Sequence, residues 1–267
     1  MLVLVCSTAA TASLAWLISG VVRPEAYLLE LQIAVTLVAA VAATAIMARS
    51  IDRREWSYMG MSRHAARPTL LVTGWCVGMV AIALACVLLL AGGWLDILQT
   101  GSGGGWAAAA LRTTVILTIA AFAEELIFRG YLLSIVRDSI GVRGAVLFTS
   151  ALFGLLHLLN PGATAQSVAI VTLAGVLLAT VRLALKSLYA AWMAHLGWNW
   201  LMAVPLHAPV SGERFDSPGY VAVTTGPTWL SGGPWGPEGG AVAAVCMVAG
   251  IAYLYTRHRR EESSHDG

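Results

Sequence analysis

The stretch AFAEELIFRG, residues 121–130, lies at the end of an apolar run that begins near Ala107. Charged side chains within apolar helices of membrane length are rare, face the protein interior and usually mark a functional site. On a helix, Glu125 and Arg129 share a face, whereas Glu124 points about 100° away from Glu125. We therefore expect Arg129 to neutralise Glu125 and Glu124 to face another group. The alternative is a buried charge cluster that only fixes helix packing.

The composition indicates an integral membrane protein. Of the 267 residues, 58% are hydrophobic and only 11% are charged, whereas soluble domains carry about 25% charged residues. The apolar runs are long enough for helices rather than barrel strands. The four cysteines are scattered through these runs without CxxC spacing, which is typical of small core residues and not of a disulfide framework or a zinc ribbon.

The apolar segments predict an all-α fold, a polytopic membrane bundle of about eight transmembrane helices. These segments lie at about 2–21, 27–48, 69–93, 107–131, 143–159, 166–185, 188–206 and 240–256. The first segment lacks a positively charged start and is followed at once by the second. We therefore expect a retained membrane helix rather than a cleaved secretion signal, and a multi-pass protein of the cell membrane.

The placement of charge predicts that both termini are cytoplasmic. With this orientation, thirteen of the sixteen Lys and Arg residues fall inside, and only Arg23, Arg112 and Arg214 remain outside. This asymmetry follows the positive-inside rule and requires an even number of spans. The basic loop 49–68, which contains tryptophan and tyrosine, is then expected near anionic lipid headgroups, with substrate docking as the alternative.

The loops divide the chain into three predicted parts. The Gly-rich segment 97–105 predicts a flexible outer loop, and the Gly- and Pro-rich segment 207–239 predicts an outer loop that forms a partial lid. The polar tail 257–267 is expected to be disordered. The predicted parts are 1–106 with the N-terminal helices and the basic loop, 107–206 as the core, and 207–267 with the outer loop, last helix and tail.

Two further polar motifs lie in later apolar segments. The sequence FGLLH ends at His157, and HLGWN runs from His195 to Asn199, so these last two residues share one helix face. A lone histidine in an apolar helix is more often a hydrogen-bonded core residue than a catalyst. Two histidines, an asparagine and a carboxylate pair, all within the four segments between 107 and 206, favour a reaction site.

Helix geometry predicts which of these residues meet. The segments 107–131 and 143–159 are joined by a short turn at 138–142, which predicts an antiparallel hairpin. Glu124 and His157 are equidistant from the midpoint of this turn. We therefore expect the two side chains to lie at matching depth and to meet across the pair.

These residue types suit the hydrolysis of an amide. A carboxylate and a histidine that lie side by side can share and activate a water molecule. A second histidine and an amide offer hydrogen-bond donors where an oxyanion develops, as His195 and Asn199 would. Alternatively, Glu124, His157 and His195 would hold a divalent metal such as zinc, whose bound water attacks. The residues alone leave both chemistries open.

The motifs EExxxR, FxxxH and HxxxN occur in this order on successive apolar segments, and no HExxH, GxGD, GxSxG, GxGxxG or P-loop motif is present. At these residues the chain resembles the CAAX-protease and bacteriocin-processing family of intramembrane proteases, often called CPBP or Abi. The resemblance covers about residues 107–206. The roles that it implies are a general base at Glu124 acting with His157, oxyanion stabilisation by His195 and Asn199, and structural support from Glu125 and Arg129.

The resemblance implies an intramembrane endopeptidase, of glutamate type or metal-dependent. Its substrate would be a membrane-embedded or lipidated protein or peptide in the lipid bilayer, with no nucleic-acid partner. One alternative is a non-catalytic membrane immunity or scaffold protein that keeps the polar cluster for binding. Another is a transporter with an ion relay through Glu124, His157 and His195, which the lack of internal repeats disfavours. Loss of activity in a folded Glu124→Ala variant would identify the enzyme.

Overall fold

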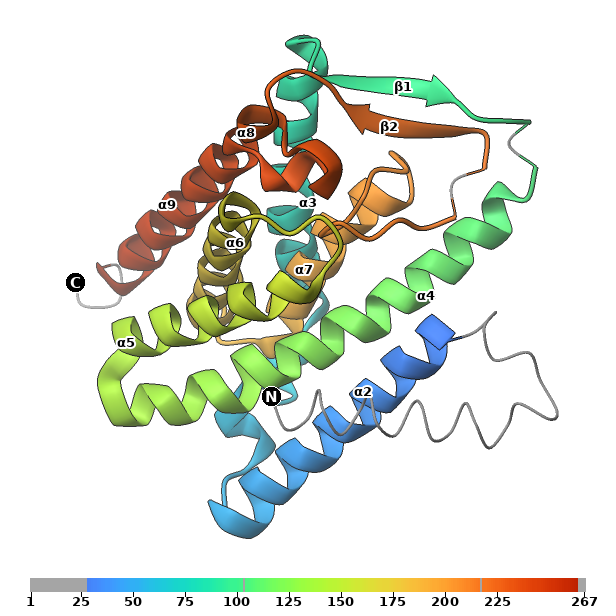
Figure 1. The fold of residues 1–267 in the computed structure, drawn as a ribbon. Coiled ribbons are helices and arrows are strands. Elements are labelled where there is room, and N and C mark those ends of the chain that lie inside the picture. The colour runs from blue at the N-terminus through green and yellow to red at the C-terminus, as the bar shows by residue number, and fades with distance from the viewer. Residues whose placement is uncertain (1–27, 103, 217, 264–267) are drawn as a thin grey trace, which may run out of the picture.

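The structure is a computed structural model that describes residues 28–102, 104–216 and 218–263. This part of the chain is mainly helical (Figure 1). Its main helices are α2 (Leu28–Ala45), α3 (Pro68–Ala91), α4 (Trp106–Glu125), α5 (Leu133–Leu156), α6 (Ala165–Ala184), α7 (Leu188–Ala203) and α9 (Ala241–Ser263). The expected first span at 2–21 lies outside the described residues.

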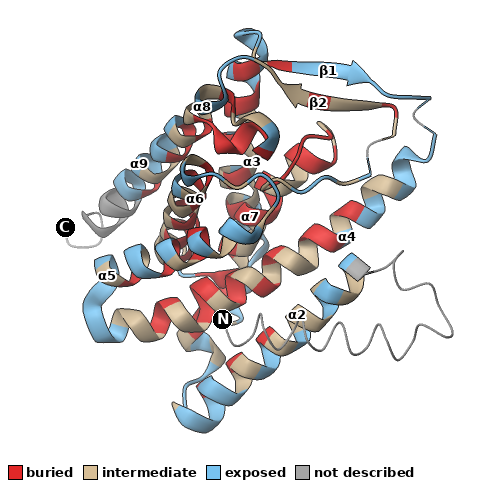
Figure 2. Cartoon of the chain, in the orientation of Figure 1, coloured by how far each residue is buried: buried red, intermediate tan, exposed pale blue. Residues whose placement is uncertain are grey.

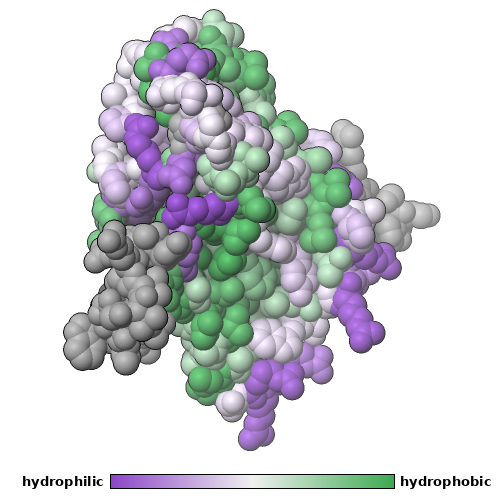
Figure 3. Space-filling view, turned by 90° about the vertical axis from the view of Figure 1, so that its right-hand side faces the viewer, coloured by the Kyte–Doolittle hydropathy of each residue, from purple (hydrophilic) through white to green (hydrophobic). Residues whose placement is uncertain are grey.

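Four helical stretches of the described chain are long and apolar enough to cross a membrane: Leu29–Ile51, Pro68–Ala91, Trp106–Leu159 and Ala165–Ala184. Helix α7 and the apolar part of α9 are helical where spans were expected, but both are shorter, so these lengths do not confirm a count of eight. Figure 3 shows hydrophobic side chains gathered over the middle of one face, with hydrophilic side chains toward its ends. A surface of this kind suits contact with lipid.

The expected hairpin is confirmed. Helix α4 continues through a π-helical turn, Leu126–Leu132, directly into α5. The chain then reverses within α5 at Gly141, whose φ of 78° and ψ of 172° are accessible to glycine at little cost (Figure 1). On the returning leg, Phe153 packs against Phe128 of the first leg with ring centroids 5.2 Å apart. The two legs therefore lie side by side at the level of the charged stretch.

Helix α7 is held against α3 by close backbone contact. A Cβ atom at Gly74 would lie 2.1 Å from the Ala190 carbonyl oxygen, and one at Gly78 would lie 1.8 Å from that of Ala194. Small residues four positions apart let two membrane helices approach in this way. Figure 2 shows that buried residues are concentrated on α3, α6 and α7, whereas α2 is largely exposed or half-buried. Helix α7, which carries His195, is thus part of the closely packed, buried interior.

At the end of the molecule where α3 ends and α4 begins, two strands join distant loops (Figure 1). Strand β1 (Leu95–Gln99) pairs antiparallel with β2 (Tyr220–Thr224), with Ile97 opposite Ala222. The prediction of a flexible loop is therefore wrong for residues 97–99, because a long-range partner supplies backbone hydrogen bonds that local glycine content does not reveal. Three short helical turns follow β2: α8 (Thr228–Ser231), Gly233–Trp235 and Pro237–Gly239. Helix α9 then continues through Ser263, so the predicted disorder of the tail is wrong up to that residue.

The basic loop between α2 and α3 is folded into short helical turns, at Ile46–Ile51, Trp56–Met59 and His64–Ala66. The Tyr58 hydroxyl lies 2.7 Å from the Asp138 carboxylate, and Arg54 pairs with the same carboxylate at 3.3 Å. Burial and this carboxylate raise the pKa of Tyr58 to about 12, so the phenol stays protonated and donates at neutral pH. These contacts fasten the loop to the hairpin turn.

Candidate functional site

The centre of the site is a buried ion pair. The side chains of Glu125 and Arg129 are both 0% exposed, and Arg129 Nη1 lies 3.0 Å from Glu125 Oε1. Arg129 also donates from Nη2 to the Gly175 carbonyl on α6 at 3.2 Å, and its guanidinium lies 4.2 Å from the centroid of the Phe153 ring. The expected pairing of Glu125 with Arg129 is therefore confirmed. It joins the helical run of residues 106–132 to α5 and α6.

His195 on α7 lies between the two adjacent carboxylates. Its Nδ1 atom is 3.0 Å from Glu125 Oε1, so the Nδ1–H group donates to Glu125. Its Nε2 atom faces Glu124 Oε2 at 3.9 Å. This second separation is too long for a direct hydrogen bond and short enough for a shared water. Glu125 thus fixes the orientation of His195, as carboxylate partners of histidine commonly do.

His157 ends α5 and opens the helical turn His157–Leu159. Its Nδ1 atom lies 2.8 Å from the Phe153 carbonyl oxygen. Because a carbonyl only accepts, Nδ1–H is the donor and Nε2 of the neutral ring is left as an acceptor. The Phe153 ring packs against both histidines, with centroid separations of 4.6 Å to His157 and 6.0 Å to His195.

Glu124 and His157 line one cavity of about 500 Å³ between α2, α5 and the helical run of residues 106–132. The two side chains thus face a common cavity, as their matching depth predicts, and their direct meeting across the hairpin stays a prediction. The wall that α2 and the start of the turn Ile46–Ile51 form extends from Leu29 to Met47 and is mostly apolar. The Glu124 side chain is 37% exposed, in contrast to the fully buried Glu125. The two neighbouring acids therefore face different environments, as their helical spacing predicts.

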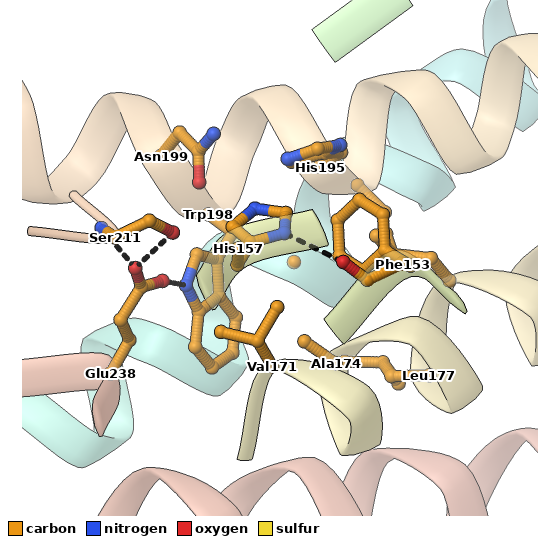
Figure 4. A pocket seen from close by; sticks show the side chains of 13 residues that line it. Phe153, His157, Val171, Ala174, Leu177, His195, Trp198, Asn199, Ser211 and Glu238 are labelled. Carbon is orange, nitrogen blue, oxygen red and sulfur yellow. Dashed lines mark hydrogen bonds between the residues drawn. The ribbon is translucent and has the colours of Figure 1, made fainter. Parts of the chain in front are cut away.

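A second, smaller cavity of about 30 Å³ lies behind His157 and is also lined by His195 and Asn199 (Figure 4). His157 belongs to both cavities. The structure therefore brings Glu124 and His157 together on one cavity and gathers His157, His195 and Asn199 on the other. All four predicted catalytic residues lie around the place where these cavities adjoin.

The alternative metal site depends on how its three expected ligands are placed. Within the described ranges, no group of three or more His, Cys, Asp or Glu side chains is placed to hold a metal ion. Glu124, His157 and His195 are thus not placed as a set of three metal ligands.

Sequence reasoning missed one part of the small cavity. Glu238, on the outer loop, is buried at 6% exposure and lines this cavity with Trp198 and Ser211 (Figure 4). Its carboxylate accepts from Trp198 Nε1 at 2.6 Å, from the Ser211 amide at 2.5 Å and from the Ser211 hydroxyl at 2.9 Å. The only local signal was an acid between Pro237 and Gly239 in an otherwise uncharged stretch. Its partners are 27 and 40 residues away in the sequence.

The fold and the site define a helical membrane protein with a buried cluster of acids, histidines and an amide. Residues 105–201 match the family described as "Type II CAAX prenyl endopeptidase Rce1-like". This part of the chain is thus an Rce1-like domain, consistent with the CPBP family that the motifs indicate. The match includes all six predicted site residues. No curated protein and no solved structure matches the chain.

Proposed function

We propose that this protein is an intramembrane endopeptidase that hydrolyses a peptide bond of a membrane-embedded or lipidated protein or peptide. The observation that carries the proposal is the shared cavity of Glu124 and His157, which adjoins the pocket of His195 and Asn199. The Rce1-like domain supports a CAAX-protease type of peptidase. A carboxylate and a histidine on the same wall of a cavity can polarise one water molecule between them.

In the proposed reaction, a water molecule donates one O–H to Glu124 and the other to Nε2 of His157. Glu124 takes the first proton as the water oxygen forms a bond with the carbonyl carbon of the substrate. It then gives this proton to the leaving amine as the C–N bond breaks, so no co-reactant besides water is consumed. The hydrogen bond of His157 to the Phe153 carbonyl fixes which ring nitrogen faces the water.

The oxyanion formed in this step would be stabilised from α7. Asn199 offers amide N–H donors, and His195 offers Nε2–H when both of its ring nitrogens carry protons. Glu125 holds His195 in place through Nδ1, and Arg129 in turn neutralises Glu125. Glu125 and Arg129 are thus positioning residues, because they act through His195 rather than on the substrate.

The large cavity would admit the substrate from the membrane. The wall formed by α2 and the first residues of the turn Ile46–Ile51 extends over 19 residues, from Leu29 to Met47, which corresponds to about 28 Å of helix. An apolar wall of this length suits a membrane-embedded segment or a lipid chain.

We further propose that the chain is a multi-pass protein of the cell membrane with eight spans and cytoplasmic termini. Its catalytic core would be residues 107–206, flanked by 1–106 and 207–267.

The test is cleavage of a membrane-associated peptide library by the purified protein in detergent. The wild type is compared with Glu124→Gln, which keeps the shape of the side chain, and with Glu213→Gln on the exposed outer loop. We expect Glu124→Gln to lower kcat by about 10³-fold, since removal of a general base costs 10²–10⁴-fold. Glu213→Gln should cleave like the wild type.

Two other outcomes would change the assignment. Activity that is lost to a chelator and restored by zinc would make the enzyme metal-dependent. A well-folded wild type that cleaves no peptide would contradict the proposal and favour a non-catalytic immunity or scaffold protein.

A further inference from the structure

Glu238 is a buried acid that the proposed reaction does not use. It is 6% exposed and forms no ion pair within 4.0 Å in the described part of the chain. Its three hydrogen bonds come from the neutral donors of Trp198 and Ser211. A carboxylate buried without a cation is costly, and in membrane proteins such groups usually mark function.

The carboxylate lies on the small cavity of the site. Figure 4 shows Glu238 and Ser211 on one side of the cavity, with Asn199 and His157 facing the same space. A carboxylate has about four acceptor positions, and Glu238 uses three of them for Trp198 and Ser211. One acceptor position is therefore available for a group in the cavity.

The size of the cavity limits what it can hold. Its volume is about 30 Å³, and one water molecule needs about 10–15 Å³ measured in this way. The cavity therefore holds about two water molecules and is too small for a large side chain. A buried water needs two to four polar partners. Glu238, Ser211 and Asn199 provide them, whereas Val171, Ala174 and Leu177 form apolar walls.

Hydrolysis consumes one water molecule in each turnover, and the large cavity that would admit the substrate has mostly apolar walls. We propose that Glu238, with Ser211, holds a small store of water in the small cavity and supplies it to the reaction at His157. This inference rests on the proposed function. Glu238 is thus a positioning residue, because it acts on the substrate only through water.

Two other roles for Glu238 make different predictions. If it only fastens the outer loop to α7, its loss should lower thermal stability and leave the kinetics of the folded protein unchanged. If the cavity instead binds part of the substrate, its loss should raise KM. Loss of a store of water should instead lower kcat, because water is consumed in the chemical step. Thermal stability and KM are not the quantities that it changes first.

The experiment compares two changes of different kind in the full-length protein. Glu238→Gln alters the acceptor, and Ala174→Val fills the cavity with hydrocarbon while all polar groups remain. We expect each to lower kcat by about tenfold, the effect of losing one hydrogen bond to a charged group, with KM unchanged. Glu213→Gln, an exposed acid of the same loop, is the control. A rise in KM alone, or lower stability with unchanged kinetics, would overturn the inference.

A second measurement does not depend on activity. An experimental structure of the full chain in a lipid nanodisc should show ordered water bonded to Glu238 and Ser211, and this water should be absent in Ala174→Val. A dry cavity in the wild type would overturn the inference even if peptides are cleaved. If this water is present but the protein cleaves no peptide, the cavity is hydrated as inferred. That result would contradict the proposed function and, with it, the supply of water to a reaction.

Discussion

The two walls of the site, α7 and α2, differ in how firmly they are attached. Helix α7 lies in the interior, and its backbone touches α3 at Gly74 and Gly78. Helix α2 is mostly exposed or half-buried and contributes the long apolar wall of the large cavity (Figure 2). A hydrolase needs rigid placement of its reacting groups, whereas a membrane substrate needs an access route from the lipid to the site. We infer that α7 positions the chemistry and that α2 borders the access route.

The largest effect on stability is expected from Arg129→Ala, which breaks the buried ion pair that supports His195 of α7. The change leaves Glu125 buried without its arginine, although His195 still donates to it. Breaking a buried ion pair costs about 3–5 kcal/mol. Thermal unfolding in detergent measures the loss, with Arg137→Ala at a partly exposed pair as the control. Equal stability of the two variants would show that the buried pair does not hold the site together.

The close contact of α3 with α7 predicts the next effect. Gly78→Ala places a methyl group where the Ala194 backbone now lies, so the helices must separate. Overpacking of this kind costs about 1–3 kcal/mol. Activity should fall as well, because α7 carries His195 and Asn199. Gly101→Ala, where nothing lies within 4 Å, is the matched control. Unfolding temperature and kcat together would show whether α7 tolerates displacement.

Substitutions on α2 that narrow the large cavity should instead raise KM. Ala43 of α2 lines the large cavity, whereas its neighbour Ala42 is exposed and does not line it. Ala43→Leu narrows the cavity, and we expect KM to rise about tenfold with kcat unchanged, the pattern of lost uniform binding. Ala42→Leu should behave like the wild type. If both variants cleave normally, the substrate does not pass along α2.

Local geometry explains what the sequence could predict. The contact of Glu125 with Arg129 follows from four-residue spacing on one helix, and the shared cavity of Glu124 and His157 follows from a short turn between two helices. Both predictions need only helix geometry. The family resemblance added roles for His195 and Asn199, because no spacing rule relates α7 to α4.

The region of β1, β2 and the loop 207–239 was harder to predict because its contacts are long-range. The pairing of β1 with β2 joins segments about 125 residues apart in sequence. The contact of Glu238 with Trp198 depends on how the outer loop folds back over α7. Glycine and proline in a loop indicate turns but not where the loop lies. The sequence therefore indicated that the loop 207–239 is a partial lid, but it did not indicate that Glu238 of this loop is buried.

The smallest effect is expected at the N-terminal end of α2. Arg112 of α4 pairs with Glu30 of α2 at 2.6 Å and with Asp216 of the outer loop at 2.8 Å, and these side chains are partly exposed. Exposed ion pairs contribute about 0–1 kcal/mol, so Glu30→Gln should change the unfolding temperature little. If α2 borders the access route, the loosened helix should admit substrate faster and lower KM about twofold, which corresponds to about 0.4 kcal/mol. Asp216→Asn removes the other partner of Arg112 without touching α2 and should leave KM unchanged. An equal response to both changes would mean that Arg112 orders the outer loop rather than the position of α2.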